Sequence, residues 1–296
     1  MTQAKVNGVE LEYETWGDSG GQPLLLVGGL GTQILTWHEL LVQALVDRDF
    51  SVIAYDNRDI GLSTKFDDWG PADINAAFKQ ARAKQSVSAP YTLEDMADDA
   101  AALLDHFGID RAHIVGNSNG GAIAQTFAIR HPAKMKSLTS IMATSGRRGL
   151  PRPSDAASEW LARPRNPSGT REGAMQEAVN TSYIIGSPGF PRDEAAIREK
   201  AGRLFDRSFY PAGISRQLLA SIASGDSRVD RLSEISAPTL VIHGREDPLV
   251  PLACAEDVQK SITAAKIRII DGMGHDYPAE IVPVIASHIQ DFVDRL

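Results

Sequence analysis

The sequence predicts an α/β protein with a mostly parallel, doubly wound sheet and an inserted helical segment. Short, continuous apolar runs recur along the chain and are typical of strands buried on both faces of a parallel sheet. Helical patterns separate these runs, which indicates strand–helix–strand crossovers. One long stretch, residues 146–235, interrupts the alternation with helical periodicity of its own.

The size and composition of the chain are those of an ordinary globular protein. Its 296 residues suffice to bury a large core without a disulfide or a structural metal, and 43% are hydrophobic while 23% are charged. The net charge of −8 repels a phosphate backbone, so we expect no nucleic-acid partner. The first residues lack the features of a signal peptide, and Cys254 is the only cysteine. We therefore expect a cytoplasmic protein that does not associate with a membrane.

The amino-terminal residues predict an antiparallel hairpin. Asn7-Gly8 favours a tight turn, and residues 9–16 alternate apolar with polar side chains at a period of two. The apolar runs that follow predict the buried parallel strands, at residues 24–27, 52–54, 114–115, 141–142, 240–242 and 267–270.

Helical patterns fill the intervals between these strands. The clearest one starts at Thr92, which together with Asp95 resembles a capping box, and Gly108 closes it. Strands and helices that alternate in this way form an open sheet whose ligands bind outside the carboxyl ends of the strands.

Two stretches break the alternation. Residues 64–90 are mixed and polar, and we expect a long loop or a short helix there. Residues 146–235 begin rich in Arg, Pro and Ser and then become helical, with several aromatic side chains. We predict a core of residues 1–145 and 236–296, and a helical cap, or lid, of residues 146–235 inserted into it.

Ser118 lies in a motif that places a nucleophile at the sheet edge. Residues 116–120 read Gly-Asn-Ser-Asn-Gly, between an apolar strand and a helix of small residues. Such a turn holds the serine in a strained conformation with its hydroxyl exposed, and glycines flank it because Cβ atoms would collide there. The N-terminus of the following helix favours a developing oxyanion. We predict that Ser118 is a catalytic nucleophile.

A nucleophilic serine needs a histidine as base and an acid that orients the histidine. His275 lies in a glycine-flanked loop after a late strand, whereas the other six histidines fall on helices or strand edges. Asp247 lies in the loop after the preceding strand. Glu246 and Asp271 are rival acids, but Glu246 would point elsewhere and Asp271 sits near the strand end. We predict His275 as the base and Asp247 as the orienting acid.

The glycine-rich turn at residues 28–31 has two interpretations. A dinucleotide-binding fingerprint would need a third glycine at position 34, and this chain has Ile34 there. Asp56, at a later strand end, could mimic the acid that binds a ribose. As an oxyanion turn it lets the backbone N–H near Leu30 join that of Asn119 at the substrate carbonyl. We favour the second interpretation and expect these two N–H groups to form an oxyanion hole.

The sequence contains no convincing set of metal ligands. Neither two histidines at helical spacing with a glutamate nor a cysteine pair occurs. We expect no cofactor and no metal. The expected partner is a small-molecule ester, and a homodimer stays open.

These motifs together resemble the α/β-hydrolase superfamily over nearly the whole chain. The resemblance rests on residues 28–31, 56–63, 116–120, 238–247 and 272–275. The chain order serine, aspartate, histidine is also the one that this superfamily uses. Within it, residues 56–58, 272–276 and 205–217 most resemble the aclacinomycin methylesterase-like carboxylesterases. The resemblance implies an α/β-hydrolase fold and the cleavage of a carboxylic ester.

Two departures bear on the substrate. Asn119 stands where such proteins commonly carry Met or Gln, and its polar side chain can alter the pocket. Asn117 resembles the meta-cleavage product hydrolases, which usually carry a tryptophan beside the histidine, where this chain has Asp276-Tyr277-Pro278. We predict a serine carboxylesterase that hydrolyses small to medium apolar esters through an acyl-enzyme intermediate. The alternatives are a carbon–carbon bond hydrolase and a receptor-like relative that binds its ligand with little or no turnover.

Overall fold

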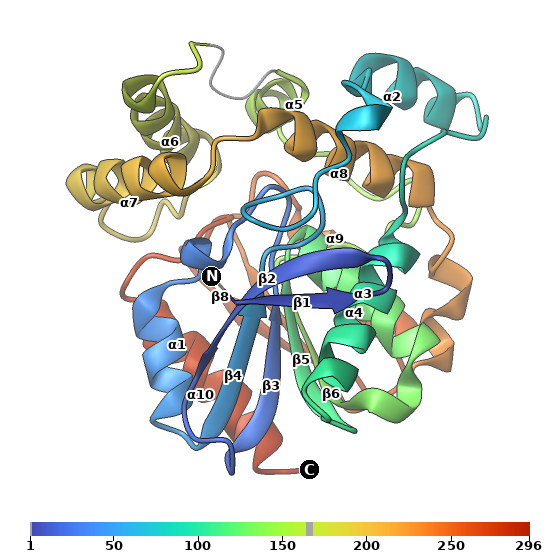
Figure 1. The fold of residues 1–296 in the computed structure, drawn as a ribbon, viewed down its shortest axis with the longest axis vertical. Coiled ribbons are helices and arrows are strands. Elements are labelled where there is room, and N and C mark those ends of the chain that lie inside the picture. Colours follow the sequence, from blue (N-terminus) through green and yellow to red (C-terminus); the bar gives the residue numbers. More distant parts are fainter. Residues whose placement is uncertain (1, 164–167) are drawn as a thin grey trace.

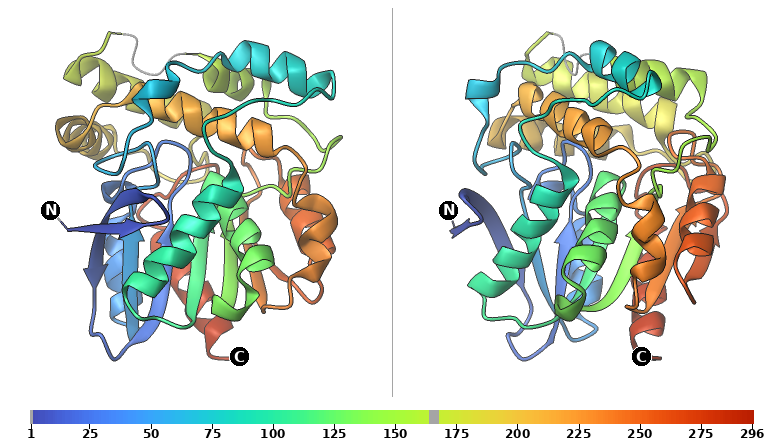
Figure 2. Two further views of the ribbon diagram at one scale, coloured as in Figure 1. Left: turned by 45° about the vertical axis from the view of Figure 1, so that its right-hand side comes forward. Right: turned by 90° about the vertical axis from the view of Figure 1, so that its right-hand side faces the viewer.

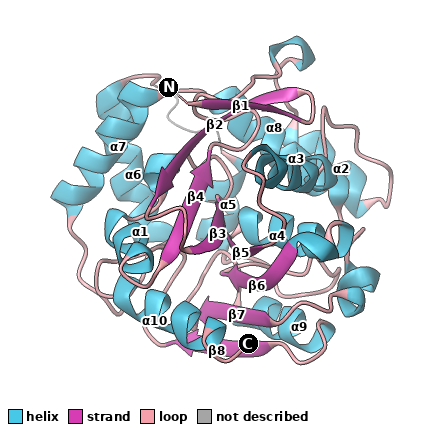
Figure 3. Cartoon of the chain, turned by 60° about the horizontal axis from the view of Figure 1, so that its bottom comes forward, coloured by secondary structure: helices cyan, strands magenta, loops and turns pink. Residues whose placement is uncertain are grey.

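One mixed sheet forms the centre of the protein. The computed structural model describes residues 2–163 and 168–296. Within them, eight strands lie in the order β1-β2-β4-β3-β5-β6-β7-β8 (Figure 3). They are β1 (Gln3–Val6), β2 (Val9–Trp16), β3 (Gln22–Val27), β4 (Phe50–Tyr55), β5 (Ala112–Asn117), β6 (Met135–Ile141), β7 (Thr239–Gly244) and β8 (Lys266–Ile270). Strands β3 to β8 are parallel, which confirms the predicted fold class.

The antiparallel part of the sheet is its amino-terminal end. β1 pairs with β2, and β2 pairs with β4. Asn7 and Gly8, which join β1 to β2, have φ values of 46° and 78°. Positive φ at both central residues is what a tight hairpin turn with the right twist requires. The predicted hairpin is confirmed.

Helices flank both faces of the sheet. They are α1 (Glu39–Val46), α2 (Ile74–Arg82), α3 (Leu93–His106), α4 (Asn119–Arg130), α5 (Asp155–Ala162), α6 (Arg171–Ile185), α7 (Glu194–Arg207), α8 (Pro211–Ser224), α9 (Leu252–Ser261) and α10 (Val282–Val293). Short 3₁₀ helices are η1 (Ile34–Thr36), η2 (Asp67–Trp69), η3 (Pro132–Lys134) and η4 (Val229–Glu234). Helices α1 and α10 cover one face of the sheet, and α3, α4 and α9 cover the other (Figure 3).

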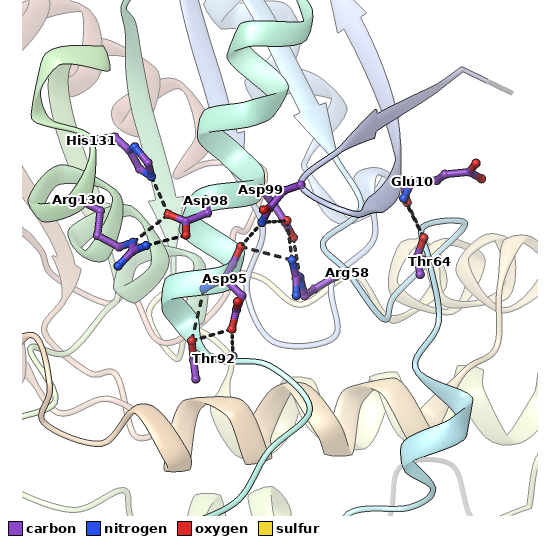
Figure 4. Close-up of polar contacts among 10 residues, drawn as sticks. Glu10, Arg58, Thr64, Thr92, Asp95, Asp98, Asp99, Arg130 and His131 are labelled. Atoms are coloured by element: carbon purple, nitrogen blue, oxygen red, sulfur yellow. Dashed lines mark hydrogen bonds and ion pairs between the residues drawn. The ribbon is translucent and has the colours of Figure 1, made fainter.

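The start of α3 follows the predicted capping pattern. The backbone N–H of Asp95 donates to Thr92 Oγ1 at 3.3 Å, and that of Thr92 donates to Asp95 Oδ2 at 2.8 Å (Figure 4). Gly108 follows the helix with a φ of 65°. The capping box and the closing glycine predicted from the sequence are therefore confirmed. Both could be predicted because each depends on residues that are close in the chain.

A layer of helices lies over the carboxyl ends of the strands (Figures 1 and 2). We call α2 and α5 to α8 the covering helices. Helix α2 is the short helix expected within residues 64–90, and it packs against α8. At the other end of the inserted stretch, η4 packs against α4 and α9 beside the sheet. The division at residues 146 and 235 stays a prediction, and residues 164–167 of that range lie outside the described residues.

The strand predicted at residues 267–270 differs from the expectation of burial on both faces. β8 is at the edge of the sheet, where Lys266 and Arg268 are exposed and Ile270 is buried. An edge strand has a neighbour on one side only, so its outer residues meet solvent. The prediction of burial was wrong because an apolar run does not reveal its position in the sheet.

None of the helices in residues 2–163 and 168–296 combines the length and the apolar character that crossing a membrane requires.

Candidate active site

Ser118 lies in the sharp turn between β5 and α4. Its φ of 52° and ψ of −122° are strained for a residue with a side chain. A Cβ on Gly116 would lie 2.2 Å from the carbonyl oxygen of Gly120, and one on Gly120 would lie 2.0 Å from that of Val27. Only glycine therefore fits at the two flanking positions. The strained turn predicted for residues 116–120 is confirmed.

His275 lies between Ser118 and Asp247. Its Nε2 is 2.9 Å from Ser118 Oγ, and its Nδ1 is 2.7 Å from Asp247 Oδ2. The other carboxylate oxygen of Asp247 accepts the backbone N–H groups of Leu249 and Val250 at 2.9 and 2.8 Å. Such a carboxylate holds the proton of His275 on Nδ1, which leaves Nε2 to accept the proton of Ser118.

The two rival acids have other partners. Glu246 accepts the backbone N–H of Gly272 at 2.6 Å. Asp271 pairs with Arg245 at the surface, and its side chain is 79% exposed. Among the described residues, Asp247 is thus the carboxylate that is hydrogen-bonded to His275.

A second histidine lies behind Asp247. The side chain of His243 is fully buried, and its Nε2 is 2.7 Å from the carbonyl oxygen of Val250 and 3.6 Å from Asp247 Oδ2. Burial lowers the pKa of His243, because an imidazolium would lose its hydration there. A neutral His243 adds no positive charge beside Asp247. Sequence reasoning placed His243 among the six histidines on helices or strand edges and gave it no part in the site.

Among residues 2–163 and 168–296, the backbone N–H groups of Leu30 and Asn119 have no hydrogen-bond partner, and neither do those of their neighbours Gly29 and Gly120. Asn119 begins α4, where N–H groups lack an intrahelical acceptor. Gly29 packs against the serine, since a Cβ on it would lie 3.3 Å from Ser118 Cβ. The carbonyl of Gly29 accepts Thr32 Oγ1 at 3.0 Å and Thr32 N–H at 3.3 Å. Because the two ends of a trans peptide point in opposite directions, this also orients the Leu30 N–H.

The structure disfavours the dinucleotide interpretation of residues 28–31. The carboxylate of Asp56 is buried and accepts the backbone N–H groups of Ile34 and Leu62, both at 2.8 Å. It also pairs with Arg207 at 2.7 Å. Asp56 is therefore engaged within the protein and is not available to a ribose. In the described part of the chain, no group of three or more His, Cys, Asp or Glu side chains is placed to hold a metal ion.

The loop that carries His275 is held by the last residue of α6 and by the segment that follows this helix. The backbone N–H of His275 donates to the carbonyl of Ile185 at 2.7 Å, and that of Gly274 donates to Ser187 Oγ at 2.9 Å. Ser187 in turn donates to Asp276. Sequence reasoning missed Ser187, because it lies 87 positions from Gly274 and no local pattern links the two.

The sheet order and the serine turn at the edge of the sheet define the class of the protein. A family model described as "alpha/beta hydrolase fold" matches residues 22–186, more than half of the chain. The chain therefore belongs to the α/β hydrolase fold family. The resemblance inferred from the sequence motifs is confirmed.

Particular relatives narrow the comparison to hydrolases. Rhodomycin D methylesterase DauP of Streptomyces sp. (strain C5) is 27% identical, over 95% of this chain and 94% of its own. The 2-hydroxymuconate semialdehyde hydrolase of Pseudomonas sp. (strain CF600) is 29% identical, over 93% of this chain and 88% of its own. The crystal structure of an enol-lactonase from Burkholderia xenovorans LB400 superimposes with a TM-score of 0.74 at 23% identity, covering 99% and 100% of the two chains. The family and the relatives support hydrolase activity.

Proposed function

We propose that this protein is a serine carboxylesterase that hydrolyses small to medium apolar esters through an acyl-enzyme intermediate. The observation that carries the proposal is the hydrogen-bonded chain from Ser118 through His275 to Asp247. The unpaired N–H groups of Leu30 and Asn119 beside the serine add to it. The name of the methylesterase relative, at 27% identity, also supports ester cleavage.

The first half-reaction forms the acyl-enzyme. Ser118 Oγ attacks the ester carbonyl while its proton moves to His275 Nε2. The carbonyl oxygen becomes an oxyanion that accepts the N–H groups of Leu30 and Asn119, and each such donor contributes about 3 kcal/mol. Asp247 stays ionised and stabilises the imidazolium. The intermediate then expels the alcohol, which takes the proton from His275, and the acyl group stays on Ser118.

The second half-reaction releases the acid. His275 Nε2 takes a proton from a water molecule as the water oxygen attacks the acyl carbonyl. The same two N–H groups hold the second oxyanion. When it collapses, the bond to Ser118 Oγ breaks, the serine regains its proton from His275, and the carboxylic acid leaves.

An ester panel tests this proposal. Purified protein would be assayed with p-nitrophenyl acetate, butyrate and octanoate, and with a p-nitrophenyl carbamate, whose carbonyl is open to the same attack. We expect the wild type to hydrolyse the esters and Ser118→Ala to show only background hydrolysis. Binding without turnover by the wild type, or full activity of Ser118→Ala, contradicts the proposal.

A carbon–carbon bond hydrolase is the second candidate. Asn117 directly before the serine favours it, as does the 29% identity to the 2-hydroxymuconate semialdehyde hydrolase. Asp276 and Tyr277, which follow His275, disfavour carbon–carbon bond cleavage, because the meta-cleavage product hydrolases usually carry a tryptophan beside the catalytic histidine. A yellow dienoate substrate loses its colour on cleavage, so its turnover rate relative to the esters separates the two candidates.

A cytoplasmic location and an oligomeric state stay predictions.

A further inference from the structure

Helix α8 contacts both backbone segments that carry the candidate oxyanion donors. Gln217 Oε1 accepts the backbone N–H of Gly31 at 2.9 Å, directly after Leu30. Ser221, one helical turn later, donates its hydroxyl to Asn119 Oδ1 at 2.6 Å. One face of a covering helix is therefore bonded to both sides of the candidate oxyanion hole.

Both polar atoms of the Gln217 amide are hydrogen-bonded inside the protein. The side chain is 0% exposed, and its Nε2 donates to the carbonyl of Arg58 at 2.8 Å. Arg58 is itself fixed by two hydrogen bonds of 2.6 Å to Asp99 (Figure 4). Gln217 thus connects the Gly31 N–H to a rigid, buried ion pair.

Other contacts already hold α8 in place. Arg216 forms a buried two-point ion pair with Asp59, at 2.6 and 2.7 Å. The backbone of Gly213 lies so close to the core that a Cβ there would be 1.8 Å from the carbonyl oxygen of Asp59. An apolar side chain at position 217 would suffice to bury the helix, and a buried amide is costly unless all its groups are bonded. The polar residue at position 217 thus points to a role in orienting the backbone that it binds.

The turn that receives this hydrogen bond is intrinsically flexible. Gly31 has a φ of 69° and lies in a glycine-rich segment with many accessible conformations. Thr32 holds the peptide before Leu30 through the Gly29 carbonyl, and Gln217 holds the peptide after it. The donor is therefore fixed from both sides. A shift of about 1 Å in a catalytic group is enough to change a rate about 100-fold.

We propose that Gln217 and Ser221 are positioning residues that set the geometry of the oxyanion hole from α8. Gln217 acts through the turn at residues 29–31, and Ser221 acts through Asn119. This inference rests on the proposed serine hydrolase function. It gives a helix above the site a part in the chemical step, in addition to covering the substrate.

Four variants on α8 test the inference. Gln217→Leu removes both amide hydrogen bonds, Ser221→Ala removes the hydroxyl, and Ser221→Thr retains it. Ser224→Ala is the matched control, because Ser224 is a buried serine on the same helix whose hydroxyl bonds to Leu93 N–H and the Ala220 carbonyl, away from the oxyanion segments. Each variant is assayed with p-nitrophenyl butyrate for kcat and KM, and its melting temperature is measured.

The expected result is a loss in kcat with little change in KM. We expect about a 10- to 100-fold loss for Gln217→Leu and a smaller one for Ser221→Ala, with near-normal kcat for Ser221→Thr and Ser224→Ala. Affinity for a trifluoromethyl ketone, which forms a tetrahedral adduct with an oxyanion, should fall in parallel with kcat. Affinity for the product butyrate should not. If Gln217→Leu does not fold, the comparison of Ser221→Ala with Ser221→Thr and Ser224→Ala decides.

The two proposals fail in different ways. Wild-type protein that does not hydrolyse the ester, or hydrolyses it without Ser118, overturns the proposed function. Ser118-dependent hydrolysis with unchanged kcat in Gln217→Leu and Ser221→Ala overturns the positioning role alone. An equal loss of activity in Ser221→Ala and Ser224→Ala, in step with melting temperature, also overturns it, because such a pattern reflects helix stability.

Discussion

The flanks of the sheet and its carboxyl edge are held by different kinds of contact. On the flanks, aliphatic side chains such as Leu25 and Ile285 pack into two buried clusters, one on each face. At the carboxyl edge, the covering helices meet the core through charged and amide groups, with Arg207 on Asp56 and Arg216 on Asp59. The two kinds of contact differ in directionality. Apolar packing has no preferred direction, whereas a bidentate ion pair or a hydrogen bond of a side-chain amide fixes the orientation of the groups that it joins.

This difference predicts two classes of substitution. Changes on the flanks should lower the free energy of unfolding and leave the chemistry of the folded protein intact. Changes at the carboxyl edge should alter loops that carry Ser118, His275 and the glycine turn, and therefore affect the rate as well.

Asp247→Asn is expected to have the largest effect on rate. An amide cannot hold the His275 proton on Nδ1 in the same way, so Nε2 no longer accepts the serine proton, and kcat should fall about 10⁴-fold. The melting temperature should change far less than the rate. Steady-state kinetics with p-nitrophenyl butyrate measures this, and Glu246→Gln, which neutralises the neighbouring acid, is the control. A comparable loss in Glu246→Gln contradicts the assignment of Asp247.

Asp59→Asn tests the ionic edge. Arg216 and Asp59 have side chains that are 1% and 0% exposed, so neutralising the acid leaves a buried, unpaired cation. We expect a loss of about 3–5 kcal/mol in the free energy of unfolding. The control is Glu39→Gln, whose pair with Arg203 is exposed and should contribute at most about 1 kcal/mol. Equal losses in urea denaturation would show that burial does not distinguish the two pairs.

Leu25→Ala tests the apolar flank. Leu25 is 0% exposed in the centre of β3, and its truncation leaves a cavity that should cost about 2–5 kcal/mol of stability. Its kcat, measured well below the melting temperature, should match that of the wild type. A large drop in kcat with a small loss of stability would contradict the separation between flank and edge.

His113, a buried histidine on the flank of the sheet, should make the free energy of unfolding depend on pH, with a smaller effect than the substitutions above. Burial lowers the pKa of His113 to about 4, from an ordinary value of 6.5. Between these values the unfolded chain binds a proton that the folded protein does not, so acidification favours unfolding by about 1.4 kcal/mol per pH unit. The contribution of His113 to stability is complete above pH 6.5 and falls as the pH drops towards 4.

Urea denaturation at pH 7.5 and pH 5 measures this dependence. On going from pH 7.5 to pH 5, the free energy of unfolding of His113→Gln should fall by about 2 kcal/mol less than that of the wild type. Identical losses in the two proteins would mean that His113 does not carry the acid sensitivity.

Much of the fold could be predicted because its signals are local. The hairpin at Asn7-Gly8, the capping box at Thr92 and the strained turn at Ser118 each depend on a few adjacent residues. The meeting of Ser118, His275 and Asp247 followed from their loops, since the carboxyl ends of parallel strands share one edge. The catalytic roles of these residues stay a proposal.

The missed features depend on contacts between distant residues. Gln217 and Gly31 are 186 positions apart, and no periodicity connects them. Helix α2 joins the covering helices through tertiary packing against α8, a contact that no local pattern signals. The position of β8 at the sheet edge is likewise a property of the assembled sheet, so residues 267–270 could not reveal it.

Covalent labelling tests the central claim most directly. Wild-type protein would be treated with a fluorophosphonate, digested, and examined by mass spectrometry for the modified residue. A single adduct on Ser118, which is lost in Ser118→Ala and reduced in His275→Ala, is the result that we predict. An adduct on another serine, or no labelling of active protein, would contradict Ser118 as the nucleophile.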